Sequence, residues 1–407
     1  MTMTEQKKAV VPRLRFPEFR DAGPWEVKRL GELARELLDG DWIESKDQSL
    51  DGIRLIQTGN IGLGKFIDNA DKVRFISEDT FERLKCSEVF PGDLLISRLP
   101  DPAGRCCLIP NIGKRMITAV DCTIVRLDQQ KAIPYFCLSY CQTDRYFQEV
   151  GTLSAGSTRK RISRQNLGDV RIPTPKLSEQ QKIADCLSSL DEMIEAQQQK
   201  LELLQQHKKG LLQQLFPREG ETIPRLRFPE FRDAGPWEVK RLGEVADVYQ
   251  PETISKSNLT DDGPFLVYGA NGIIGRFDCY NHEQPQIAVT CRGSTCGEVT
   301  LTRPRSWITG NSMVVNVDNS PGMIKGFLYF QLKGTNWNYL ITGSGQPQIT
   351  GEIKKHKVAL PSLPEQQKIA DCLSSLDELI ELQAKKLEAL KAHKKGLMQQ
   401  LFPNYDV

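Results

Sequence analysis

The chain has 407 residues, which is too long for one compact domain and predicts at least two domains with connecting segments. Apolar residues make up 39% and charged residues 26%, proportions that exclude an intrinsically disordered protein. The 54 basic and 52 acidic side chains leave a net charge of +2. This balance excludes a histone-like polycation but allows basic faces on parts of the surface.

Several other classes of protein are also disfavoured. No stretch approaches the roughly 20 apolar residues that cross a bilayer, and the charged start lacks the apolar core of a secretory signal. We therefore expect a cytoplasmic protein without membrane contact. The 11 cysteines include no CxxC pair, and only 4 histidines are present. This composition favours reduced thiols and no metal site.

The chain opens on a segment that occurs twice. Residues 12–34 recur at 224–246 with one change, Leu33 against Val245. A second repeat covers 177–217 and 363–403, where 32 of 41 positions are identical. The segments between these repeats, 35–176 and 247–362, differ in length and sequence. A duplicated frame that carries two different inserts is the simplest interpretation.

Both inserts show the pattern of short strands followed by a helix. Runs rich in Val, Ile and Thr, bounded by Gly, Pro and Asn, predict strands at 53–57, 72–76, 93–98, 106–109 and 119–127. In the second insert the same signal covers 265–268, 286–290, 298–302 and 312–317. Helices are expected at 135–150 and 323–340. The inserts are therefore predicted to be α+β domains of one type.

The longer repeat predicts two long helices, at 177–217 and 363–403, that end at prolines. Their apolar residues follow a heptad pattern, which is interrupted by Gln197 and Lys208 in one copy and by Gln383 and Lys394 in the other. The matching faces should pack as an antiparallel coiled coil, with the inserts near opposite ends and a pseudo-twofold repeat. The predicted seam is Ile183, Leu187, Leu190, Ile194, Leu201, Leu204, Leu211, Leu215, Ile369, Leu373, Leu376, Ile380, Leu387, Leu390, Leu397 and Leu401.

No motif in the chain predicts catalysis. Residues 59–65, GNIGLGK, match the spacing of a phosphate-binding loop, but Phe66 replaces the Ser or Thr that binds magnesium and no helix signal follows. The related GANGIIGRF of the second insert lacks the pattern. No methyltransferase motif is present, and His207 and His393 occupy repeat-related helix positions that favour solvated side chains.

Polar and basic loops make the inserts candidates for DNA binding. Arginine pairs with guanine edges, while Gln and Asn pair with adenine, so loops that mix these residues suit base recognition. Lysine and arginine would also contact phosphates. The candidate contacts are Lys65, Arg98, Arg105, Arg159, Lys160 and Arg161 in the first insert, and Arg276, Arg292, Ser294, Gln346 and Gln348 in the second.

The frame resembles the specificity subunit of type I restriction–modification systems. The resemblance is carried by WEVKRLGE at 25–32 and 237–244, by the helix openings LSEQQKIADCLSSLDEMI and LPEQQKIADCLSSLDELI, and by their HKKGLLQQLFP and HKKGLMQQLFP ends. Within the inserts, PGDLLISR, VTCRGSTCGEV and SWITGNSMVV also fit. This resemblance implies target recognition domains at 12–176 and 224–362, spacer helices at 177–217 and 363–403, and a linker at 218–223.

The resemblance also implies a function and partners. Each insert would read one half of a split, asymmetric DNA target, and the helices would set the gap. Two modification subunits would supply S-adenosylmethionine and adenine N6 methylation, and restriction subunits would supply ATP- and Mg-dependent translocation and cleavage. This chain would hold no cofactor and would not be an enzyme. The alternative is a coiled-coil adaptor that binds proteins without DNA; a self-contained restriction enzyme is disfavoured because no catalytic motif is found.

Overall fold

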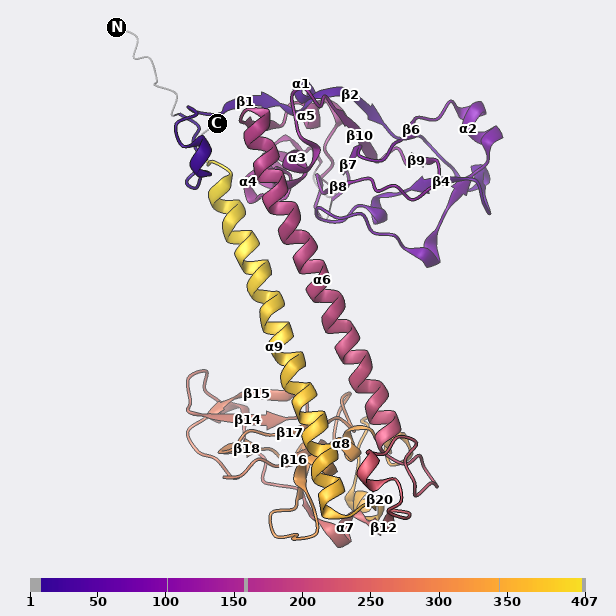
Figure 1. Ribbon diagram of the computed structural model, residues 1–407, viewed down its shortest axis with the longest axis vertical. Helices are drawn as coiled ribbons and strands as arrows, with labels where there is room; N and C mark the ends of the chain where they lie inside the picture. Colours follow the sequence, from indigo (N-terminus) through magenta and orange to yellow (C-terminus); the bar gives the residue numbers. More distant parts are fainter. Residues whose placement is uncertain (1–8, 101, 157–159, 344, 405–407) are drawn as a thin grey trace. The chain divides into compact units, whose positions relative to one another are not determined.

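The computed structural model describes residues 9–100, 102–156, 160–343 and 345–404 (Figure 1). The chain divides into two compact units: unit 1 is Met1–Ala196 with Leu387–Val407, and unit 2 is Gln197–Lys386. Each unit contains one copy of the short repeat, one insert and a part of each long helix. Both mix helices with sheets, which confirms the predicted α+β class. Among the described residues, no helix combines the length and apolarity needed to span a membrane.

The described residues of unit 1 form three sheets. β1 (Glu26–Arg29) pairs antiparallel with β11 (Arg171–Thr174), so the short repeat is joined to the end of the first insert. A four-stranded antiparallel sheet follows the order β2 (Ala34–Asp39), β10 (Cys122–Leu127), β7 (Leu94–Ser97) and β8 (Cys106–Leu108). A five-stranded sheet follows the order β3 (Gln48–Ser49), β5 (Phe75–Ile76), β4 (Ile53–Ile56), β9 (Met116–Thr118) and β6 (Glu88–Val89), with β4 and β9 parallel.

Unit 2 repeats this topology. β12 (Glu238–Arg241) pairs with β20 (Lys357–Leu360), again antiparallel. The four-stranded sheet has the order β13 (Asp247–Tyr249), β19 (Ser312–Asn316), β16 (Ile287–Thr290) and β17 (Val299–Leu301). The third sheet is reduced to β15 (Gly272–Phe277), β14 (Phe265–Gly269) and β18 (Ser306–Ile308), with β14 and β18 parallel. The two inserts are therefore variants of one domain, which confirms the predicted internal repeat.

One short helix lies in each copy of the short repeat, α1 (Leu30–Leu33) and α7 (Leu242–Val245). The described short helices of the inserts are α2 (Glu78–Leu84), α3 (Pro134–Tyr140), α4 (Asp144–Leu153) and α5 (Arg164–Gly168) in unit 1, and α8 (Lys325–Lys333) in unit 2. The prediction of one helix over 135–150 was wrong. The Thr143 hydroxyl caps α4 by accepting from the Tyr146 N–H at 3.3 Å and donates to the Tyr140 carbonyl at 2.8 Å. Since this cap begins a new helix, the chain breaks between α3 and α4.

The long helices are α6 (Leu177–Leu215) and α9 (Leu363–Leu401). In unit 1, Lys394 of α9 lies 2.6 Å from Asp191 of α6, and in unit 2 Lys208 of α6 forms an ion pair with Asp377 of α9. Residue numbers rise along one helix as they fall along the other, so the pairing is antiparallel. The apolar residues at the heptad positions named above are buried or half-buried.

The end of each long helix completes a core. In unit 1, Phe402 follows α9 and packs on Phe136 of α3 with ring centroids 5.4 Å apart. In unit 2, Phe216 follows α6 and packs on Phe327 of α8 at 5.3 Å. The core of unit 1 therefore depends on a residue from the second of the two chain segments that form this unit.

Candidate nucleic-acid interface

A buried ion pair anchors the short repeat to the start of each long helix. In unit 1, the Arg15 Nε and Nη2 atoms donate to Glu179 at 2.7 Å each, and the Trp25 indole donates to the same carboxylate at 3.2 Å. In unit 2, Arg227 donates to Glu365 at 2.7 and 2.8 Å. The hydrogen bond to Glu179 raises the pKa of Arg15, and that to Glu365 raises the pKa of Arg227.

The residue after each of these glutamates is a glutamine whose side-chain amide binds backbone groups of the insert. Gln180 is fully buried; its Oε1 accepts from the Ile133 N–H at 2.9 Å and its Nε2 donates to the Lys131 and Pro175 carbonyls. Gln366 makes the same three kinds of contact in unit 2, with the Ile324 N–H and the Gly322 and Pro361 carbonyls. Sequence reasoning missed this pair, although a polar residue repeated at a helix opening was a signal.

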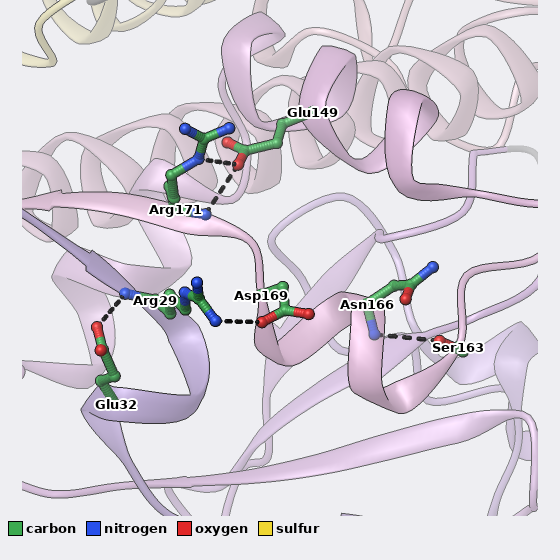
Figure 2. A network of polar contacts seen from close by, with 7 residues as sticks. All are labelled: Arg29, Glu32, Glu149, Ser163, Asn166, Asp169 and Arg171. Carbon is green, nitrogen blue, oxygen red and sulfur yellow. Dashed lines mark hydrogen bonds and ion pairs between the residues drawn. The ribbon is translucent and has the colours of Figure 1, made fainter. Parts of the chain in front are cut away.

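Further ion pairs hold the strands that close the first insert (Figure 2). Arg29 of β1 lies 2.9 Å from Asp169, and the Arg171 Nε and backbone N–H both donate to Glu149 at 3.1 Å. At the start of α5, the Asn166 N–H donates to the Ser163 hydroxyl at 3.1 Å. These contacts position the loop that ends at Ser163.

In unit 1 this loop meets the loop after β7. The Ile162 N–H donates to the Arg98 carbonyl at 3.2 Å, and Arg161 forms a 2.8 Å ion pair with Asp121. Lys160 and Arg161 are exposed. Arg98 is buried, donates to the Val120 carbonyl and lies 3.3 Å from Asp39. Burial lowers the pKa of Arg98, an effect that the charge of Asp39 opposes.

The remaining predicted residues of the first insert have different surroundings. Arg105 donates to two backbone carbonyls of a distant segment, those of Ile61 at 2.8 Å and Thr58 at 3.1 Å. It also donates to the Pro100 carbonyl of its own loop at 3.2 Å. Lys65 is 71% exposed and lies 3.5 Å from Glu195. Arg159 falls outside the described residues.

In unit 2 the equivalent two loops also meet. The Ile349 N–H donates to the Cys291 carbonyl and the Gly293 N–H to the Pro347 carbonyl, both at 3.0 Å. The loops 291–297 and 342–349 therefore lie together, and the predicted contacts Arg292, Ser294, Gln346 and Gln348 are all exposed on them. Arg276 is half-buried on β15, where it donates to the Gly263 carbonyl at 2.8 Å.

The chemistry of the described residues suits binding more than catalysis. His282 has both ring nitrogens engaged, with the Tyr249 hydroxyl at 2.9 Å and the Asn281 Oδ1 at 2.6 Å, and burial lowers its pKa. Burial also lowers the pKa of His356 to about 4. Burial raises the pKa of Cys122 to about 11, which makes this thiol a poor nucleophile. Within the part of the chain that is described, no three His, Cys, Asp or Glu side chains gather as metal ligands.

Comparison with known proteins agrees with this picture. Residues 23–206 and 235–392 match the model of the type I restriction modification DNA specificity domain. The MjaVIII type I restriction enzyme specificity subunit of Methanocaldococcus jannaschii is 24% identical over 95% of this chain and 93% of that protein. The putative MjaX specificity subunit of the same organism is 23% identical over 93% of this chain and 92% of the relative.

Two solved structures share the fold. The S subunit of the type I restriction–modification system from M. genitalium gives a TM-score of 0.67 at 18% identity, over 97% of this chain and 100% of that one. A chain from a structure of type I R-M complex assembly and conformational transition gives 0.54 at 17% identity, over 93% of this chain and 98% of that one. The protein therefore belongs to the type I restriction–modification DNA specificity family, as a specificity subunit with two recognition domains and no catalytic role of its own.

Proposed function

We propose that the chain reads a bipartite, asymmetric DNA sequence, with one half bound by the recognition domain at 12–176 and the other by the domain at 224–362. The helices at 177–217 and 363–403 would set the gap between the halves. A helix of 39 residues has a length of about 58 Å at ~1.5 Å per residue, which corresponds to between one and two turns of duplex at ~34 Å each.

The meeting of equivalent loops in the two units carries this proposal. In unit 1 the two loops follow β7 and precede β11, and in unit 2 they follow β16 and precede β20. The two pairs of loops present different side chains. The first offers Lys160 and Arg161, and the second offers Arg292 with Gln346 and Gln348. Cations suit phosphates and guanine, while amides suit adenine, so the two domains should prefer different sequences.

The predicted contact residues separate into two groups under this proposal. Lys65, Lys160, Arg161, Arg292, Ser294, Gln346 and Gln348 would face DNA, whereas Arg159 lies outside the described residues and is assigned to neither group. Arg98, Arg105 and Arg276 would instead hold the loops, because their guanidinium groups already bind carbonyls of the protein. Since these three donors are engaged, they have less capacity to bind DNA.

The partners and cofactors follow from the same proposal. Two modification subunits would bring S-adenosylmethionine and methylate adenine at N6, and restriction subunits would bring ATP and Mg for translocation and cleavage. This chain would hold the duplex while a modification subunit extracts its target base, because a stacked base is out of reach. Such a complex would act on chromosomal DNA in the cytoplasm.

Sequencing the methylome of a host with and without this chain tests the proposal. We expect a split motif with methylated adenine to appear only when the chain is present. No chain-dependent motif would contradict it. The alternative, a protein adaptor without a DNA role, predicts no duplex binding at low salt, whereas phosphate contacts predict binding that declines steeply with ionic strength.

A single substitution tests the reading loops. Arg292→Ala should weaken binding to one half-site by about 1–3 kcal/mol and leave the other half-site unchanged. Arg232→Ala is the matched control, because Arg232 is an exposed arginine of the repeated frame. An equal loss on scrambled DNA would make Arg292 a phosphate contact, and no loss on any duplex would remove it from the interface.

A further inference from the structure

The glycine-rich segment of each insert forms a hairpin-like turn. In unit 2, Gly269 of β14 pairs with Gly272 of β15, so Ala270 and Asn271 form the tip. Gly272 has a φ of +74°, a backbone conformation that favours glycine. In unit 1, Ile61 pairs with Phe66 around an equivalent turn. The segment 59–65, whose spacing matches a phosphate-binding loop, therefore forms part of a turn. The sequence alone predicted no function for this turn.

The tip of the unit 2 hairpin is bound to the loop that carries Arg292. The Thr295 hydroxyl lies 2.6 Å from the Ala270 carbonyl and 3.1 Å from the Asn271 Oδ1. The Thr290 hydroxyl also donates to the Ala270 carbonyl, at 3.2 Å. Because the Gly293 N–H binds the Pro347 carbonyl, the hairpin tip, loop 291–297 and loop 342–349 form one connected group.

The exposed groups at this tip have the chemistry of base recognition. Asn271 is exposed, and an Asn amide pairs with the N6 and N7 atoms of adenine in the major groove. The contact with Thr295 limits the rotation of the amide, which reduces the entropy lost on binding. Ile273 follows on β15 and is 54% exposed, so an apolar surface that suits a thymine methyl lies two residues away.

We propose that Asn271 is a specificity-determining residue that recognises an adenine edge, with the hairpin tip acting as a third reading element beside loops 291–297 and 342–349. This inference rests on the proposed function. The corresponding tip of unit 1 is formed by Leu63, which is 59% exposed, and Gly64, neither of which has an amide side chain. The two hairpins therefore contribute to the difference between the half-sites.

Selection from a random duplex library tests the role of Asn271. The full-length chain, assembled with modification subunits, is incubated with duplexes that contain a randomised 25-base-pair segment, and the bound fraction is sequenced. The wild type, Asn271→Ala and Asn319→Ala are compared. Asn319 serves as the control because it is an exposed asparagine that follows the C-terminal end of β19. Loop 291–297 lies at the other end of this strand, where the Cys291 N–H donates to the Asn311 carbonyl.

We expect Asn271→Ala to lose the preference for adenine at one position of one half-site, by roughly 5- to 150-fold, with the other half-site unchanged. Asn319→Ala should select the wild-type consensus. An unchanged consensus for Asn271→Ala would overturn the inference and leave the proposed function intact, as would an equal loss of affinity for all sequences. If the wild type selects no consensus, the proposed function and this inference both fail.

Discussion

Replacing Arg227 with methionine tests how the frame is held. Met keeps much of the apolar stem of Arg but removes both donors to Glu365, whose side chain is only 1% exposed. Removing one partner of a buried ion pair leaves an uncompensated charge and costs about 3–5 kcal/mol. We therefore expect Arg227→Met to destabilise unit 2 by that amount, and the double variant Arg227→Met/Glu365→Gln to recover part of the loss.

The equivalent pair in unit 1 gives an internal comparison. After Arg15→Met, Glu179 would still accept the Trp25 indole N–H at 3.2 Å, whereas the buried Trp237 Nε1 has no hydrogen-bond partner among the described residues. A hydrogen bond to a charged group contributes about 1.5–3 kcal/mol, and this one is long, so Arg15→Met should cost roughly 1–2 kcal/mol less than Arg227→Met.

Urea unfolding followed by tryptophan fluorescence measures both costs, because Trp25 binds the first pair and Trp237 belongs to the core of unit 2. An Arg15→Met variant that loses as much stability as Arg227→Met would refute the role of the indole. A cost below about 1 kcal/mol for both would show that neither pair is effectively buried.

Three further predictions concern the helices and one histidine. Gln197→Leu/Gln383→Leu should raise the melting temperature but loosen helix register, because the amides bind each other in the seam; unchanged melting with one unchanged structure would count against that role. Lys394→Asp should destabilise unit 1 by about 1 kcal/mol, and adding Asp191→Lys should restore it, as a double-mutant cycle by urea unfolding would detect. Burial lowers the pKa of His356 from 6.5 to about 4, so stability should fall by about 2 kcal/mol between pH 7 and pH 5. His356→Gln should remove this pH dependence of the urea midpoint, and an unaltered slope would contradict it.

Local sequence predicted the elements that bury a regular apolar pattern. The heptads of 177–217 and 363–403 gave the long helices to within two residues of their ends, and apolar runs gave strands such as β7 and β16. β1 and β12 share the sequence EVKR and are mostly exposed. Such strands depend on backbone pairing with β11 and β20, more than a hundred residues away, which no local pattern reveals.

The sequence predicted the loops that the structure brings together in each unit, but not which of their side chains are already bound within the protein. Arg98 and Arg105 were chosen because arginine in a polar loop suits DNA, yet both bind carbonyls within unit 1. An arginine in a loop has five donors that satisfy either role, and only the fold decides which. The hairpin that carries Asn271 was not predicted, although the Asn271-Gly272 dipeptide is a hairpin-turn signal, because the glycines of GIIGRF weaken the strand signal of β15.

The contacts between frame and insert explain how one frame carries two unlike inserts. The side-chain amides of Gln180 and Gln366 bind backbone N–H and carbonyl groups of insert residues. Every residue presents the same backbone carbonyl, and every residue except proline presents the same N–H, so the attachment depends on the path of the chain and is nearly independent of its sequence. The side chains of the inserts can therefore change without weakening this attachment to the frame. Another insert should be held as firmly as the present ones if its backbone places an N–H and a carbonyl where Gln180 binds those of Ile133 and Lys131.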